Sequence, residues 1–171
     1  MMGKGISNSI NPIEGICSNQ ILGNLDATGM RFGIIVARFN DELTDELARS
    51  AVSCLIGNGA KPETIDVVRV PGAYEIPVVA EKMAASGNYS ALILLGVVVE
   101  GETQHAQMII DTTGQSILDI ACRHNIPVIN EIVGVRTWAQ AEARCLGGEN
   151  TRGWYAAEAA IETTRICQQL G

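Results

Sequence analysis

Four short runs of apolar, largely β-branched residues alternate along this sequence with longer segments of helical periodicity. The runs are 32–37, 65–70, 91–99 and 126–133. Each is short enough and apolar enough to form a strand buried on both faces, as in a parallel sheet. Because parallel strands need long crossover connections, this order predicts an α/β fold. We expect a four-stranded parallel sheet of flavodoxin-like topology between two helical layers, with right-handed crossovers.

The segments between and after these runs predict the helices. The first has its apolar residues at helical spacing over 43–56, after the capping candidates Asn40 and Asp41 and before the glycine-rich stop at 57–59. Further helices are predicted over 77–85, from about 104 to 124, over 138–146 and over 153–170.

Length and composition narrow the class of protein. A chain of 171 residues can bury roughly 70% of its unfolded surface in one core. With 12 basic against 19 acidic side chains, it lacks the positive charge of a nucleic-acid binder. No apolar run approaches the ~20 residues of a membrane helix. Residues 1–22 are predicted to be an extension, flexible or packed on a partner, and 23–171 a single domain.

The cellular compartment is predicted from the cysteines and the first residues. Five cysteines without a CxxC motif favour a reduced, cytoplasmic setting. The first twenty residues contain one lysine and no long apolar stretch, so we expect no secretory signal there.

The residues that follow each strand are the candidates for a site, since ligands of open α/β sheets bind beyond the carboxyl ends of the strands. Phe39 stands in a polar loop after the first strand. It can stack on a flat ligand or, as is more common, plug the core. Glu75 follows the second strand and can accept hydrogen bonds from ligand hydroxyls, or interact with the start of a helix.

A third loop enters a helix and resembles an anion site. The residues 101–103 can offer backbone N–H groups and the positive end of the helix dipole. His105 lies in the first turn, as a neutral base or as a surface histidine. Arg144 and Arg152 can bind a phosphate, although solvent-exposed arginine is the usual case.

Several segments together are similar to the lumazine synthase family of riboflavin biosynthesis. They are 23–41, VRVPGAYEIP (68–77), GVVVEGETQH (96–105) and RGWYAAEAAIE (152–162). The resemblance extends over about 23–165. It implies condensation of 5-amino-6-ribitylamino-pyrimidinedione with 3,4-dihydroxy-2-butanone 4-phosphate to give 6,7-dimethyl-8-ribityllumazine, phosphate and water. It implies neither metal nor cofactor.

The resemblance also implies a role for each matching residue. Phe39 would stack on the pyrimidine ring, while His105 would transfer protons during imine formation and phosphate elimination. Arg144 would reach the phosphate from a neighbouring subunit. The remaining expected contacts are to the ribityl chain (Ala73, Tyr74, Glu75), to the ring (Val97, Val98, Val99 and, by position, Asn130) and to the phosphate (Gly101, Glu102, Thr103).

The departures from the family pattern lie in the shared half of the expected site. Glu100 stands where the family usually has a basic residue, and would make the phosphate pocket less positive if it pointed inward. The segment 130–138 replaces a Phe-Gly-Val-Leu-Thr-Thr-Glu-Asn-like run, so that Asn130 takes the place of a phenylalanine that closes the ring pocket from the adjacent subunit. Arg152 replaces a lysine and keeps its charge.

The resemblance further implies a homopentamer with sites between adjacent subunits, and the turn at 147–153 is no longer than in relatives that form icosahedral shells of sixty chains. Two small-molecule substrates and, as a partner, riboflavin synthase are expected, without nucleic acid or membrane. The alternative function is a catalytically weak relative that carries flavin or lumazine or builds a shell. An electron-carrying flavodoxin or a phosphorelay receiver is disfavoured, because the loops at 38–40 and 71–72 lack their phosphate-binding and acidic signatures.

Overall fold

A computed structural model describes residues 19–101 and 104–171 of the chain. The strands are β1 (Phe32–Ala37), β2 (Ile65–Val70), β3 (Ala91–Val99) and β4 (Val128–Val135). The helices are α1 (Asp41–Gly57), α2 (Ile76–Ala85), α3 (His105–His124), α4 (Trp138–Cys145) and α5 (Arg152–Leu170). Short 3-10 helices occupy Pro62–Thr64 (η1), Ala73–Glu75 (η2) and Gly148–Asn150 (η3).

The strands form one parallel sheet in the order β2-β1-β3-β4. Phe32 is level with Ile65 of β2 and with Ala91 of β3, so the amino ends of three strands are in register. Every residue of β1 is buried, whereas the outer strands β2 and β4 are partly exposed. The predicted four-stranded parallel sheet is confirmed.

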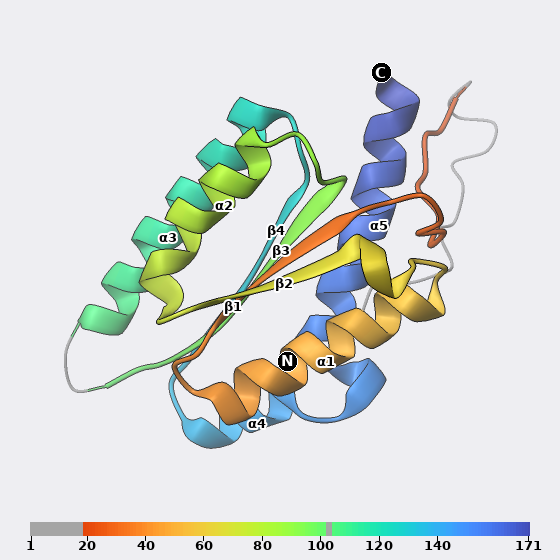
Figure 1. The fold of residues 1–171 in the computed structure, drawn as a ribbon. Helices are drawn as coiled ribbons and strands as arrows, with labels where there is room; N and C mark the ends of the chain where they lie inside the picture. Colours follow the sequence, from red (N-terminus) through yellow and green to blue (C-terminus); the bar gives the residue numbers. More distant parts are fainter. Residues whose placement is uncertain (1–18, 102–103) are drawn as a thin grey trace.

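Two helical layers cover the sheet (Figure 1). Ile34 and Val36 of β1 point into the core beneath α1, α4 and α5, while Ile35 points into a second core beneath α2 and α3. Apolar residues on both faces of one strand explain why the runs do not alternate between apolar and polar. Gly153 lets α5 approach α1, since a Cβ there would lie 2.1 Å from the carbonyl oxygen of Leu47.

The fourth strand differs from its predicted position, 126–133. It runs over Val128–Val135, two residues later. Asn125 has a left-handed backbone, with φ of 50°, and Pro127 has no N–H to donate. Ile126, which lies between them, therefore does not begin the strand. Gly134 interrupts the apolar pattern but still pairs with β3. The other predicted strands match the structure, and the helices agree to within two residues.

The described part of the chain contains no helix that is long and apolar enough to cross a membrane. Most of the predicted extension, 1–22, lies outside the described residues, so the boundary at residue 22 stays a prediction.

Candidate active site

A cavity of about 480 Å³ lies at the carboxyl ends of β1, β2 and β3; we call it the sheet-end cavity. Most residues predicted from the strand ends and from the family resemblance line it together: Phe39, Ala73, Tyr74, Glu75, Val97, Val98, Val99, Gly101 and His105. The expected residues Glu102 and Thr103 lie outside the described residues. A cavity of this volume is large enough for a small organic ligand.

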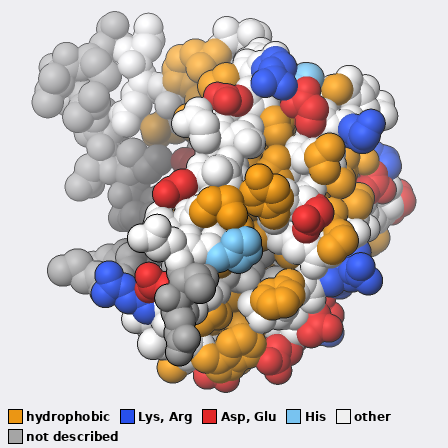
Figure 2. All heavy atoms as spheres, turned by 90° about the vertical axis from the view of Figure 1, so that its left-hand side faces the viewer, with side chains coloured by type: hydrophobic (Ala, Val, Ile, Leu, Met, Phe, Trp, Pro, Cys, Tyr) orange, Lys and Arg blue, Asp and Glu red, His pale blue; other side chains and the backbone are white. Residues whose placement is uncertain are grey.

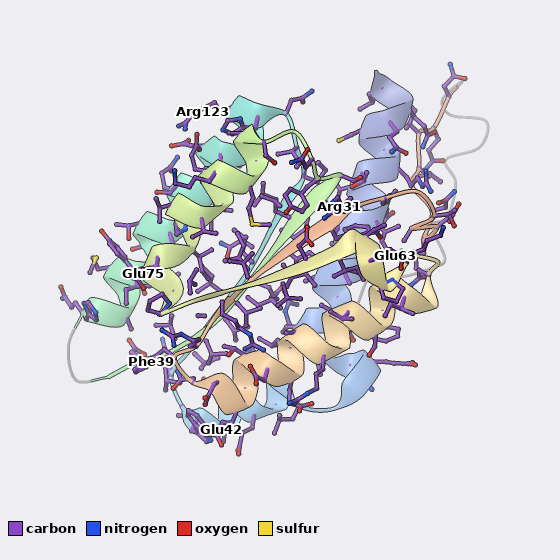
Figure 3. All side chains as sticks on the ribbon, in the orientation of Figure 1. Arg31, Phe39, Glu42, Glu63, Glu75 and Arg123 are labelled. Carbon is purple, nitrogen blue, oxygen red and sulfur yellow. The ribbon has the colours of Figure 1, made fainter. Side chains whose placement is uncertain are left out.

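Backbone hydrogen bonds hold Phe39 at the edge of this cavity. The ladder between β1 and β2 continues past the strand ends, because Arg38 N donates to Val70 O (2.8 Å) and Phe39 N donates to Pro71 O (3.1 Å). The Phe39 residue is nevertheless 70% exposed, and its side chain lies at the same end of the sheet as Glu75 (Figure 3). Phe39 therefore does not plug the core, and its ring is free to stack on a flat ligand.

Asn40 ties the same loop to β3. Its side-chain Nδ2 donates to the carbonyl oxygen of Val97, 3.0 Å away, and its backbone is left-handed with φ of 61°. Asn40 is the N-cap residue of α1, as predicted, but its side chain makes no capping hydrogen bond: the backbone carbonyl accepts from Leu43 N and Thr44 N, while the side chain crosses to β3. Asparagine suits this position because its side chain tolerates a positive φ.

Tyr74 and Glu75 supply polar side chains to the lining of the sheet-end cavity. Both are exposed residues of η2, and Glu75 also occupies the N-cap position of α2 without a capping hydrogen bond from its side chain. Glu75 Oε2 lies 3.1 Å from the position that a Cβ would take at Gly72. A larger residue at Gly72 would push the carboxylate away. The two side chains can therefore reach the hydroxyl groups of a ligand.

His105 opens α3 at the rim of the cavity, where it is exposed. Four further residues also line the cavity: Ala106 and Ile109 of α3, and Pro71 and Gly72 directly after β2. None of the four was predicted as a site residue from the sequence. Helical spacing from His105 and position directly after β2 are the signals that would have identified them.

Arg144 lies in a different cavity, of about 630 Å³, between β4, α4 and the start of α5; we call it the Arg144 cavity. The two cavities share no lining residue. Arg144 Nη1 donates to the carbonyl of Gln140 within α4 (3.1 Å). Asn130 belongs to the lining of neither cavity; it is exposed on β4 and accepts from Ile132 N through Oδ1 (3.1 Å). One copy of the chain therefore does not bring Arg144 and Asn130 to the other predicted residues.

Glu100 does not line the sheet-end cavity. Its Oε2 lies 3.7 Å from Nε of Arg136, and both groups line a small separate cavity of about 190 Å³. Glu100 N also donates to Val135 O (2.7 Å), which continues the ladder between β3 and β4 beyond the strands. The carboxylate is therefore accompanied by a positive charge from the next loop.

The described part of the chain contains no cluster of metal ligands, and two of its buried cysteines have raised pKa values. No three His, Cys, Asp or Glu side chains there are grouped as a metal site. Burial raises the pKa of the Cys54 thiol to about 12 and that of Cys145 to about 11, so both stay protonated and unreactive near neutral pH.

Comparison with known proteins identifies the family of this chain. Residues 29–168 match the family model for 6,7-dimethyl-8-ribityllumazine synthase. A 6,7-dimethyl-8-ribityllumazine synthase from Desulfatibacillum aliphaticivorans is 43% identical over 88% of this chain and 97% of its own length. Proteins of the same name from Xanthomonas euvesicatoria and Xylella fastidiosa are 38% and 36% identical, over 86% of this chain and 96% of their own. The chain therefore belongs to the 6,7-dimethyl-8-ribityllumazine synthase family.

Proposed function

We propose that the sheet-end cavity of one copy and the Arg144 cavity of a neighbouring copy together form the active site of this enzyme. As a member of its family, the chain condenses 5-amino-6-ribitylamino-pyrimidinedione with 3,4-dihydroxy-2-butanone 4-phosphate. The products are 6,7-dimethyl-8-ribityllumazine, phosphate and water. Nothing in the comparisons favours a carrier or shell protein without activity.

The sheet-end cavity has the chemistry to hold the pyrimidine substrate. The exposed ring of Phe39 offers a stacking surface, and Val97, Val98 and Val99 give an apolar floor. Tyr74 and Glu75 can exchange hydrogen bonds with the hydroxyl groups of the ribityl chain. The pyrimidine would then present its amino group toward His105.

The phosphate of the second substrate would bind between Gly101 and Arg144 of the neighbouring copy. In this proposal Glu102 and Thr103 complete the phosphate contacts. His105, beside Gly101 on the cavity wall, would transfer protons while the amine and the ketone form an imine and while phosphate leaves. Alignment of two bound substrates supplies much of the remaining acceleration.

The separation of the two cavities supports a shared site. Arg144 points into a cavity on the outer strand β4, away from Phe39 and His105, so a second copy must supply the cation if it serves this reaction. Exposed apolar side chains on α2 and α3 are suited to contact between copies: Val78, Met108 and Leu118 (Figure 2). A pentamer, and an icosahedral shell of sixty chains built from it, is the assembly that the family resemblance suggests.

The proposed setting is cytoplasmic. Cys54, Cys122, Cys145 and Cys167 are free thiols, as expected in a reducing compartment. Riboflavin synthase is the proposed partner, because it consumes the lumazine that this enzyme releases.

The observation that carries the site assignment is the meeting of Phe39, Glu75 and His105 in one cavity. Its test is lumazine formation by the Phe39→Ala variant, followed by absorbance with both substrates supplied. The KM for the pyrimidine should rise on the order of 10-fold, since stacking on an aromatic ring is lost. Leu170→Ala removes a similarly exposed apolar side chain at the end of α5 and should leave this KM unchanged. Equal values for the two variants would reject the site.

A further inference from the structure

The Arg144 cavity contains two guanidinium groups and one carboxylate. Arg144 lies in the last turn of α4, Arg152 is the first residue of α5, and Glu131 lies on β4. Sequence alone leaves both arginines open as phosphate ligands. Their surroundings in the structure are different.

Arg152 is held by Glu131 through two hydrogen bonds. Arg152 Nε lies 2.5 Å from Oε1 of the carboxylate, and Nη2 lies 3.1 Å from Oε2. Only 11% of the Glu131 side chain is exposed, against 45% for Arg152. Burial raises the pKa of Glu131, and the guanidinium opposes that rise. An incoming phosphate would have to compete with a buried carboxylate for the same two donors.

Among the residues that the structure describes, Arg144 has no carboxylate partner, and its hydrogen bond goes to the backbone carbonyl of Gln140. A guanidinium has five N–H donors, so most of those on Arg144 stay available to a ligand. The side chain is also exposed.

We propose that Glu131 sets the phosphate affinity of the Arg144 cavity by engaging Arg152, which leaves Arg144 as the arginine that binds the phosphate. This inference rests on the proposed role of the cavity in a shared active site. The type of residue agrees with this pairing: the basic side chain at 152 is an arginine, whose planar fork fits a carboxylate.

The functional consequence concerns binding and release of phosphate. With Arg152 neutralised, the cavity presents one uncompensated positive charge instead of two. Both the phosphorylated substrate and the inorganic phosphate product are then held less tightly, which limits inhibition by the product. A structural pair that only fastened α5 to β4 would not have this effect on phosphate.

The test measures inhibition of lumazine formation by inorganic phosphate. Glu131→Gln keeps the size of the side chain but removes its charge, and should lower the inhibition constant on the order of 10-fold, because Arg152 is released toward the ligand. The KM for the butanone phosphate should fall in parallel, while the KM for the pyrimidine stays the same. An unchanged or raised inhibition constant in a folded, assembled variant would overturn the proposal.

The double variant Glu131→Gln/Arg152→Gln is the matched comparison, and it is informative even if the single variant does not fold. The double variant removes both charges, and inorganic phosphate should inhibit it with the same inhibition constant as it does the wild type. An inhibition constant raised 5-fold or more would mean that Arg152 binds phosphate in the wild type, which contradicts the proposal.

Arg144→Gln separates this proposal from the shared site beneath it. If Arg144→Gln weakens phosphate inhibition while Glu131→Gln leaves it unchanged, the role of Glu131 is wrong and the shared site stands. If Arg144→Gln has no effect on phosphate inhibition, the assignment of the cavity to phosphate and the role of Glu131 fail together.

Discussion

Asn40 reaches from the end of β1 to the carbonyl oxygen of Val97 on β3, with an Nδ2–O distance of 3.0 Å. This hydrogen bond joins the loop of Phe39 to the strand that floors the sheet-end cavity. Stacking of a planar substrate depends on the distance between the Phe39 ring and β3. Asn40 therefore fixes that distance without itself lining the sheet-end cavity.

Asn40→Gly should therefore weaken binding of the pyrimidine. Glycine accepts the left-handed backbone at little cost, so the main loss is the hydrogen bond to Val97. We expect the KM for the pyrimidine to rise about 2–10-fold, in line with one lost hydrogen bond. Asn125→Gly is the control, since Asn125 has a similar φ of 50° at the far end of α3. An equal KM in the two variants would contradict the role of Asn40.

His105→Ala should slow turnover about 10–100-fold without abolishing it, since the bound substrates stay aligned after the proton-transfer group is lost. The chain has one other histidine, His124, which pairs with Glu81 on α2 through Nε2 at 2.9 Å. His124→Ala should leave kcat unchanged in the same assay. If His105→Ala keeps the wild-type rate in a folded assembly, His105 has no part in the reaction.

Glu100→Gln should change the KM for the butanone phosphate by less than about 2-fold. The carboxylate lies 3.7 Å from Arg136, both side chains are largely exposed, and solvent screens such pairs strongly. Steady-state kinetics with the phosphate substrate varied would measure this. A 10-fold fall in KM would mean that Glu100 faces the bound phosphate after all.

The amino end of the sheet contains a charged group that the site does not use. Asp66 Oδ2 accepts from Tyr89 OH (2.9 Å) and from Nη2 of Arg31 (2.6 Å), which lies at that end in Figure 3. The hydrogen bond from Tyr89, followed by that from Arg31, lowers the pKa of Asp66. A lowered folded-state pKa stabilises the protein above the unfolded value, about 3.9, and this stabilisation is lost as the pH falls through the folded value.

Asp66→Asn should therefore lower the melting temperature at pH 7 by roughly 1–3 °C, as expected for an exposed pair in a chain of this size. The difference from wild type should shrink as the pH falls below about 4, because the unfolded state then takes up a proton at Asp66, and should disappear once the folded carboxylate is protonated as well. Glu63→Gln, on the exposed helix η1, removes one negative charge elsewhere and is the control for the change in net charge. A constant difference between Asp66→Asn and wild type from pH 7 to pH 3 would contradict the lowered pKa.

Local sequence pattern was sufficient for most of the fold. The runs at 32–37, 65–70 and 91–99 match their strands because short segments rich in apolar and β-branched residues favour strands. The fourth run was misplaced because hydrophobicity does not register that Pro127 lacks an N–H, or that Gly134 can still pair within a sheet.

The candidate site likewise contains some residues that sequence could predict and some contacts that it could not. Residues directly after strands, such as Phe39 and Glu75, could be predicted from topology and from the family resemblance. The pairing of Glu131 with Arg152 could not, because it depends on how α5 packs against β4, and no local pattern encodes that distance. Similarly, asparagine is a residue type that favours helix caps, but the side chain of Asn40 donates a hydrogen bond to β3, a strand that begins about fifty residues later.

The shared active site is tested most directly by mixing two impaired variants. An Arg144→Ala subunit keeps its own sheet-end cavity, and a His105→Ala subunit keeps its own Arg144 cavity. Where these two intact halves meet in a mixed oligomer, a complete site should form.

Lumazine formation by the mixture is the measurement, with subunit exchange confirmed by mass spectrometry. The shared site predicts activity clearly above the average of the two variants measured alone. Mixed oligomers with no more than that average activity would contradict the shared site.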